Sequence, residues 1–230
     1  LASYNKEVQK LMLGSDSQVI AEGREVTVQA IGGTGALKIG ADFLKRFYPD
    51  AGVWLSRPSW ENHQQLFEAA GFVVNAYPYF DPETHGLNFA GMLETLKSIP
   101  RGGIVILHAC CHNPTGVDLT EEQWKLVVDT VREGGLIPFL DFAYQGFGDG
   151  IDSDAFAVRA LAEAGVQFLI ANSFSKSFAL YRERVGALTV VTAAIARPIL
   201  APPTFSSMAG AKYLAAPVPA KLATSPPPPQ

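Results

Sequence analysis

The sequence contains little cysteine and no apolar run long enough to span a membrane. Its two cysteines, Cys110 and Cys111, are adjacent. Neighbouring residues on a strand point to opposite faces, so a disulfide between them would be strained. Both thiols are expected to be reduced, which suits a cytoplasmic location. Residues 1–6 carry no signal-peptide pattern, and no segment reaches membrane-spanning length, so we expect no membrane association.

Neither positive nor negative charge predominates in the sequence. The formal net charge is −4 at pH 7, and the charged residues are spread along the chain. The sequence has no stripe of basic residues, so no nucleic-acid partner is expected. Hydrophobic residues make up 48% of the 230-residue chain, which is enough to bury one large domain.

Acidic residues are absent after Glu183. From Ala193 onward about half the residues are Ala or Pro, and the chain ends in four prolines before Gln230. Such a composition can bury little apolar surface, so the segment 192–230 is expected to be an extended or disordered tail. The folded domain is expected to cover residues 1–191.

Strand-like and helix-like segments alternate along the folded part. Apolar runs predict strands at 26–30, 53–55, 72–74, 104–107, 137–140, 168–171 and 187–191. Helices are expected at 4–13, from the glycine-rich loop to 47, and at 63–70, 89–97, 121–133 and 155–164, with a capping box at Thr120 and Gln123. This alternation predicts an α/β fold, a mostly parallel sheet with helices on both faces.

A glycine-rich segment, Gly33-Thr34-Gly35, follows the first strand. It departs from the dinucleotide fingerprint because Lys38 occupies the position of the third glycine, and from the P-loop because no Gly-Lys-Ser/Thr follows. Two interpretations remain equally open: a phosphate-binding turn and a plain structural turn.

Histidines and cysteines cluster in the segment from His108 to His112. A zinc site would need a second ligand cluster elsewhere, and the sequence offers none. A strand end with small buried thiols is the favoured interpretation, and no metal is expected.

Two further positions could carry chemistry. Ser173 and Lys176 fit the S-x-x-K pattern of serine acyl-enzymes, but Lys176 could equally be a surface lysine or could bond an aldehyde cofactor, with Arg184 adding positive charge nearby. Asp141 ends an apolar strand, where it could cap a helix, bind a metal or partner a buried cation. Asp154, by contrast, is expected at the surface, opening a helix.

Several segments together resemble the aspartate/aromatic aminotransferases, which are class I pyridoxal-phosphate enzymes of fold type I. The resemblance covers about residues 1–191 and matches in order and spacing. The segments are 32–36 (GGTGA), 58–63 (PSWENH), 111–116 (CHNPTG), 141–147 (DFAYQGF), 173–176 (SFSK) and 181–186 (YRERVG). It implies that residues 1–191 are a large pyridoxal-phosphate-binding domain with a seven-stranded sheet.

The resemblance also implies a role for each matching catalytic position. Lys176 would bond the cofactor and act as the base that moves the substrate proton. Asp141 would pair with the pyridinium nitrogen, with His63 behind it. Tyr144 and Asn113 would hydrogen-bond the ring oxygen and lower the pKa of the cofactor–lysine linkage.

The remaining matches would bind the phosphate, the ring or the substrate. Trp60 would stack on the ring, and Trp60 and Asn113 would also contact the substrate. The phosphate would be held by a third group of residues, which are Gly33, Thr34, Ser173 and Arg184.

The implied activity is reversible transfer of an amino group between an L-amino acid, aspartate or aromatic, and a 2-oxo acid, in a homodimer. The family's phosphate-binding tyrosine from the neighbouring subunit would precede Leu1, and its two substrate-binding arginines have no match in the tail, where Arg197 stands in a different context. The chain is therefore expected to lack the small domain. A non-catalytic cofactor-binding fragment remains an alternative. So does a serine acyl-transferase using Ser173 and Lys176, although its companion motifs are missing.

Overall fold

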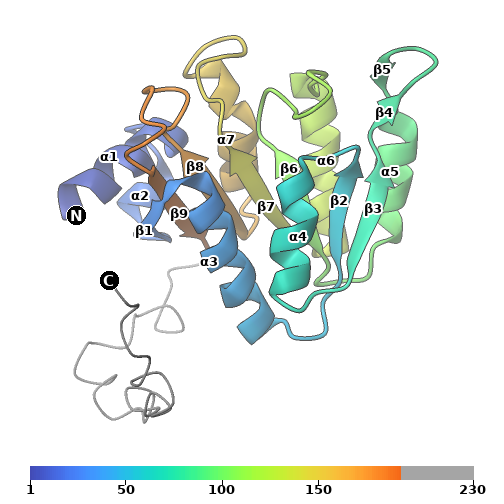
Figure 1. The fold of residues 1–230 in the computed structure, drawn as a ribbon, viewed down its shortest axis with the longest axis horizontal. Helices are drawn as coiled ribbons and strands as arrows, with labels where there is room; N and C mark the ends of the chain where they lie inside the picture. The colour runs from blue at the N-terminus through green and yellow to red at the C-terminus, as the bar shows by residue number, and fades with distance from the viewer. Residues whose placement is uncertain (193–230) are drawn as a thin grey trace, which may run out of the picture. The chain divides into compact units, whose positions relative to one another are not determined.

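A computed structural model describes residues 1–192 (Figure 1). The expectation for the tail therefore lies, from residue 193 onward, outside the described residues. The described residues all belong to one compact unit, Leu1–Ala196.

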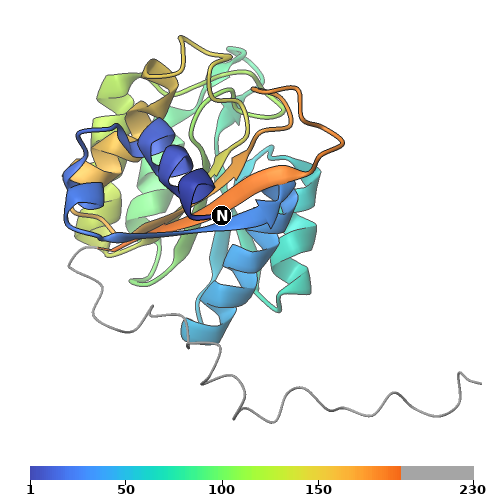
Figure 2. The ribbon, with the colours of Figure 1, turned by 90° about the vertical axis from the view of Figure 1, so that its left-hand side faces the viewer.

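A seven-stranded sheet forms the centre of this unit. Its strands are β1 (Glu25–Ile31), β2 (Val53–Arg57), β3 (Val74–Pro78), β6 (Ile104–His108), β7 (Ile137–Phe142), β8 (Phe168–Ser173) and β9 (Val185–Val191), in the order β1-β9-β8-β7-β6-β2-β3. Every neighbouring pair is parallel except those made by β9, which is antiparallel to both β1 and β8. Figure 2 shows β9, in orange, running beside β1. The expected mostly parallel α/β fold is confirmed.

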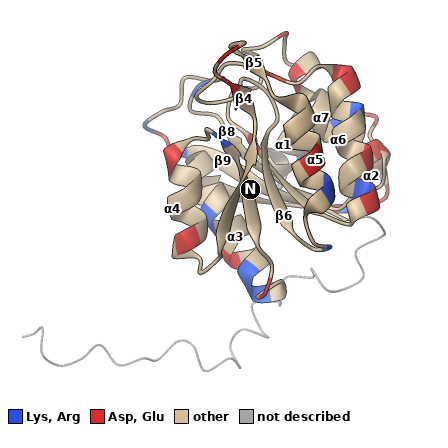
Figure 3. Cartoon of the chain, turned by 90° about the vertical axis from the view of Figure 1, so that its right-hand side faces the viewer, with Lys and Arg blue, Asp and Glu red and all other residues tan. Residues whose placement is uncertain are grey.

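Helices cover both faces of the sheet (Figure 3). The core on one face includes residues of α1 (Ala2–Leu13), α5 (Phe89–Ser98), α6 (Glu121–Gly134) and α7 (Phe156–Glu163). The other core is formed under α3 (Gly32–Phe47) and α4 (Glu61–Ala69). Shorter elements are α2 (Gln18–Ala21), the 3-10 turn η1 (Ser153–Ala155) and a hairpin of β4 (Phe80–Asp81) and β5 (Gly86–Leu87).

The central strands are apolar because they are covered on both faces. All residues of β6 and β8 are buried, from Ile104 to His108 and from Phe168 to Ser173. Parallel strands between two helix layers have no solvent face, which explains why their sequences do not alternate. Polar residues at the carboxyl ends of these strands, such as His108 and Ser173, are therefore buried as well.

Local capping signals agree with the observed helix ends. Thr120 and Gln123 form the expected capping box at the start of α6, with both reciprocal hydrogen bonds present. Gly71, which follows α4, has φ +88°, as the expected glycine at a helix end requires.

Three local expectations are corrected. The glycine-rich segment is not a loop, because α3 begins at Gly32 immediately after β1. The strand expected at 72–74 begins at Val74 instead, because Phe72 packs into the core beneath α4 before the chain joins the sheet. Asp154 is not on the surface: it is only 6% exposed, and backbone N–H groups surround its carboxylate.

The outer surfaces of the helices carry both signs of charge, with Lys and Arg interspersed among Asp and Glu (Figure 3). Among the described residues, no helix combines the length and the apolar character needed to cross a membrane.

Candidate cofactor site

The candidate site lies where the central parallel strands end. Asp141 stands near the end of β7, opposite His108 of β6 and Ala171 of β8 in the strand register. Ligands of parallel α/β sheets bind at this edge. A cavity of about 150 Å³ opens here, and its walls contain every expected site residue except His63. The lining residues are Gly33, Thr34, Leu37, Trp60, His108, Asn113, Asp141, Ala143, Tyr144, Ser173, Ser175, Lys176, Tyr181 and Arg184.

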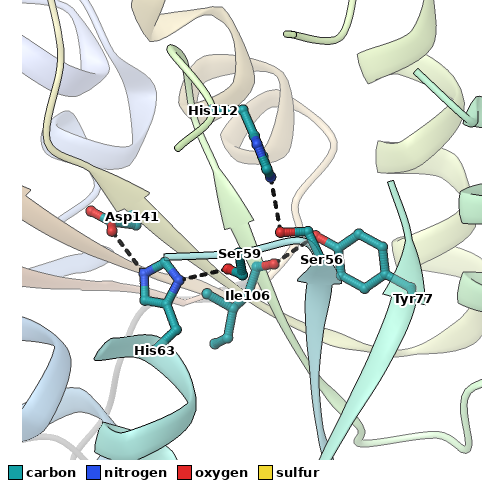
Figure 4. Close-up of polar contacts among 7 residues, drawn as sticks. All are labelled: Ser56, Ser59, His63, Tyr77, Ile106, His112 and Asp141. Carbon is teal, nitrogen blue, oxygen red and sulfur yellow. Dashed lines mark hydrogen bonds and ion pairs between the residues drawn. The ribbon is translucent and has the colours of Figure 1, made fainter. Parts of the chain in front are cut away.

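His63 is hydrogen-bonded to the Asp141 carboxylate (Figure 4). Its Nε2 is 2.8 Å from Oδ2 of Asp141, and its Nδ1 is 3.0 Å from the Ser59 hydroxyl. An ionised carboxylate only accepts hydrogen bonds. Nε2 therefore carries a proton and donates to Asp141, and Nδ1 shares a hydrogen bond with the Ser59 hydroxyl. The imidazole is fully buried, so its orientation is fixed on both sides.

Asp141 remains a carboxylate although it is buried. Burial by itself would raise the pKa of Asp141, but the hydrogen bond donated by His63 and the nearby Lys176 outweigh it, and the pKa is lowered. The cavity therefore contains a buried negative charge. Such a charge is suited to partner a cationic ring nitrogen.

His108 is a buried imidazole beside this pair. Its ring centroid is 5.0 Å from that of His63 and 4.3 Å from that of His112. Neither ring nitrogen has a hydrogen-bond partner among the described residues. Burial, together with the neighbouring His63, lowers the pKa of His108 to about 3, so the ring is neutral. An unpartnered buried ring in the cavity wall is a group that a bound molecule could satisfy.

The same residues include the one cluster in the described chain with metal-ligand spacing. Single ligand atoms of His63, His108 and Asp141 lie within 4.8 Å of one another. His63 already uses Nε2–H to bond Asp141, so a metal would have to displace that proton and break the pair. The arrangement suits a protonated ring nitrogen beside Asp141 better.

Lys176 lies above the ring of Tyr144. Its Nζ is 4.3 Å from the ring centroid, and in the described chain no carboxylate forms an ion pair with it. Both side chains line the same cavity as Asp141. An amine without a salt-bridge partner is free to react with a carbonyl group.

The N-terminus of α3 and Arg184 form a cradle on one side of the cavity. A Cβ added to Gly33 would lie 2.9 Å from the Ser173 Cβ, and one added to Gly32 would lie 2.5 Å from Nη2 of Arg184. Only glycine therefore permits this close approach. In the described chain Arg184 makes no ion pair; its Nη1 donates to the Tyr181 carbonyl at 3.2 Å. A helix N-terminus beside an unpaired guanidinium fits a phosphate group.

Trp60 and Asn113 complete the walls. Trp60 immediately precedes α4 and meets the His63 ring edge-on, with ring centroids 5.3 Å apart. Asn113 follows His112, whose ring nitrogens contact the hydroxyls of Ser56 at 2.9 Å and Thr115 at 2.8 Å. Figure 4 shows the contact between His112 and Ser56. This network fixes the loop that carries Asn113.

Sequence reasoning missed five cavity residues, of which three are polar or titratable: His108, Ser175 and Tyr181. His108 had been considered only as part of a metal motif. Its place at the end of a buried strand, in line with Asp141, was the available signal. Ser175 and Tyr181 gave no comparable signal, because the path of the loop after β8 decides which side chains face the cavity.

Comparison with known proteins identifies the family. The family model for class I and II aminotransferases matches residues 1–224. The aspartate aminotransferase of Pseudomonas aeruginosa is 60% identical over 192 residues, covering 84% of this chain and 48% of the relative. The aromatic-amino-acid aminotransferase of Escherichia coli is 53% identical over 191 residues, covering 83% and 48%. The chain belongs to the class I and II aminotransferase family.

Solved structures agree with this assignment. The crystal structure of the aromatic-amino-acid aminotransferase from Burkholderia pseudomallei, covalently bound to pyridoxal phosphate, superposes with a TM-score of 0.84 at 59% identity. The match covers 85% of this chain and 49% of that one. This chain thus spans about half the length of the relatives it matches.

Proposed function

We propose that the protein transfers an amino group reversibly between an L-amino acid, aspartate or aromatic, and a 2-oxo acid, using pyridoxal 5′-phosphate. The observation that carries the proposal is a single cavity that combines an unpaired lysine, a buried carboxylate and an anion cradle. These are the three groups that pyridoxal phosphate requires for its aldehyde, its ring nitrogen and its phosphate. The names of the relatives support the substrate class.

Each residue has a defined task in this proposal. Asp141, oriented by His63, keeps the ring nitrogen protonated, so that the bound cofactor withdraws electrons from the substrate Cα. Lys176 would hold the cofactor through its aldehyde and, once the substrate amine has displaced it there, would act as the base that moves the substrate proton. Tyr144 and Asn113 would hydrogen-bond the ring oxygen.

The other cavity residues hold the cofactor in place. Trp60 would stack on the ring and, together with Asn113, would contact the substrate. The phosphate would be held by Gly33 and Thr34 at the start of α3, by Ser173 at the end of β8 and by Arg184 just before β9.

A homodimer is part of the same proposal. A groove of about 610 Å³ runs beside α1, and its lining includes the exposed side chains of Ile151 and Phe178. Exposed apolar surface of this kind suits a protein partner, and we propose a second copy of the chain. Sedimentation of the native protein would test it, and a monomer at micromolar concentration would contradict it.

Covalent trapping of the cofactor tests the central assignment. Pyridoxal phosphate is added to the full 230-residue chain, the linkage is reduced with borohydride, and the labelled peptide is identified by mass spectrometry. We expect the label on Lys176, and we expect Lys176→Ala to remove it. Lys38→Ala is the matched control, because Lys38 lies on the exposed face of α3 and pairs with Asp42. A label on Lys38 or another lysine would show the assignment to be wrong.

The same assay separates the alternatives. A non-catalytic cofactor-binding protein would be labelled at Lys176 but would not transaminate when assayed as the native protein. A serine acyl-transferase would instead be labelled at Ser173 by a fluorophosphonate, without added pyridoxal phosphate. Ser173 is 7% exposed, and its hydroxyl accepts a hydrogen bond from the Ser175 N–H at 3.3 Å. Neither feature favours a nucleophile.

A further inference from the structure

The loop that carries Tyr144 is organised around one buried carboxylate. Asp154, in η1, is 6% exposed. Its Oδ2 accepts hydrogen bonds from the backbone N–H groups of Gly146 at 2.7 Å and Gly148 at 3.0 Å, and its Oδ1 accepts one from Asp149 at 2.8 Å. Within the described chain no Lys or Arg forms an ion pair with it. The three peptide dipoles therefore compensate this buried charge.

The backbone of the loop fits closely around this carboxylate. Gly146 has φ +94°, a conformation that favours glycine. A Cβ added to Gly148 would lie 2.6 Å from Oδ1 of Asp154, too close for any side chain. The carboxylate and the loop therefore depend on each other for their positions.

Along the chain, Tyr144 stands between the end of β7 and the loop backbone that binds Asp154. On one side it follows Asp141 of β7 by three residues, and on the other it precedes Gly146 by two. Its carbonyl accepts a hydrogen bond from the Phe147 N–H at 3.0 Å. The buried Gln145 side chain donates to the carbonyls of Leu11 at 3.0 Å and Ile151 at 2.9 Å. The path of the backbone at Tyr144 is thus fixed from both ends, and Asp154 provides three of the contacts after it.

We propose that Asp154 is a positioning residue whose carboxylate, by binding the loop backbone, holds the Tyr144 phenol in place beside Lys176. The inference rests on the proposed function, in which the phenol donates to the ring oxygen of the bound cofactor. Asp154 does not itself line the cavity, so its effect on the cofactor passes through Tyr144.

Asp154→Asn tests the proposal in the full chain loaded with pyridoxal phosphate. The asparagine side chain keeps the shape but has one acceptor oxygen, so it cannot bind all three N–H groups. The readout is the pH midpoint of the cofactor's visible absorbance change. Loss of a hydrogen bond from the phenol should raise this midpoint, by roughly one pH unit for Tyr144→Phe. Asp154→Asn should raise it in the same direction by a smaller amount.

A double mutant distinguishes positioning from general stability. If Asp154 acts through Tyr144, adding Asp154→Asn to Tyr144→Phe should move the midpoint no further. Asp152→Asn is the matched control, since Asp152 lies two residues away with its side chain 86% exposed and should leave the midpoint unchanged. A merely structural role would lower the melting temperature of Asp154→Asn without moving the midpoint, and that result would overturn the proposal.

A second variant reaches the same carboxylate from the opposite side. Gly148→Ala places a methyl group against Oδ1 of Asp154 and should shift the midpoint in the same direction as Asp154→Asn. If neither variant folds while Tyr144→Phe does, Asp154 serves the stability of the domain and the proposal is wrong. A wild-type chain that gives no visible band would instead refute the proposed function itself.

Discussion

Single residues at the end of β7 decide the electrostatics of the cavity. Asp141 is 7% exposed and keeps its charge because His63 donates a hydrogen bond to it and Lys176 lies nearby. Removing one partner of a buried charge pair costs roughly 3–5 kcal/mol. The carboxylate should therefore contribute more to cofactor binding than any exposed acidic residue.

Asp141→Ala should weaken pyridoxal-phosphate binding by about two orders of magnitude or more. The control is Asp42→Ala, because Asp42 is on α3 with its side chain 56% exposed. Spectroscopic titration of each variant with the cofactor measures the effect. Equal affinities in the two variants would contradict the role given to Asp141.

His108 should make stability depend on pH. Its pKa is lowered from 6.5 to about 3 in the folded state, first by burial and then by His63. Between these two values the unfolded chain binds a proton that the folded chain does not, so acidification from about pH 6.5 destabilises the fold. The loss is about 1.4 kcal/mol per pH unit for one histidine. Burial lowers the pKa of His112 to about 4, which acts in the same direction.

His108→Gln should therefore reduce the slope of unfolding free energy against pH between pH 6 and 4.5. The reduction expected is about 1 kcal/mol per pH unit. Urea unfolding at several pH values measures it, and His85→Asn, at an exposed position, is the control. The inference about His108 would not survive an unchanged slope.

Single-residue chemistry was predictable where a residue type is rare in its setting. An aspartate at the end of an apolar strand and a lysine in a serine-rich loop stand out, and the structure places both Asp141 and Lys176 in one cavity. Asp154 could not be predicted in the same way. Its burial depends on hydrogen bonds to the loop backbone, which leave no side-chain pattern in the sequence.

At the level of elements, α3 matters because it carries the anion cradle at its first turn. Its Gly40 faces the sheet, and a methyl group there would overlap the ring of Phe139 on β7. Replacing a helical glycine with alanine stabilises a helix by about 1 kcal/mol, whereas overpacking a core costs about 1–3 kcal/mol. The cost of overpacking should exceed the gain in helix propensity, because both α3 and β7 are held in place by their neighbours.

Gly40→Ala should therefore lower stability by up to about 2 kcal/mol, or several degrees in melting temperature. It should also weaken cofactor binding, since α3 must move away from the sheet. Gly134→Ala is the control, because a methyl group there would meet only the Leu136 side chain, at 3.2 Å. A Gly40→Ala variant that is more stable than the wild type would show that α3 and Phe139 of β7 are packed loosely enough to admit a methyl group.

Element positions were predictable to the extent that burial leaves a continuous pattern. The strands from β6 to β8 were expected within a residue or two of their observed bounds, because both faces are buried. The antiparallel direction of β9 was not expected. Direction depends on where the chain crosses the sheet, and an apolar run such as that of β9 reads the same in either direction.

At the scale of the whole molecule, the 230-residue chain spans about half the length of the relatives it matches. One arginine, Arg184, lines the cavity in the described residues, and the proposed function assigns it to the phosphate. No described arginine is then left in the cavity for the substrate carboxylates. Charge-assisted hydrogen bonds contribute about 1.5–3 kcal/mol each, so each substrate carboxylate left without an arginine should reduce kcat/KM by roughly ten- to a hundredfold or more.

The 230-residue chain expressed by itself should thus bind pyridoxal phosphate weakly and transaminate negligibly. Its mass is confirmed first, and turnover of aspartate with 2-oxoglutarate is then measured beside a full-length relative. Turnover near an ordinary enzyme rate of about 10 per second would show that this half contains all the groups that the reaction needs.

The antiparallel strand β9 also sets the order in which the protein can be completed. Among the described strands, the first one, β1, forms an edge of the sheet and pairs only with β9, from Glu25 with Val191 to Ile31 with Val185. More than 150 residues therefore leave the ribosome before β1 gains its neighbour, and α3 begins directly after β1. Such long-range pairing slows folding and leaves strand edges open meanwhile. A nascent chain stalled before Val185 would leave β1 and one edge of β8 unpaired, and such open strand edges can pair with other chains.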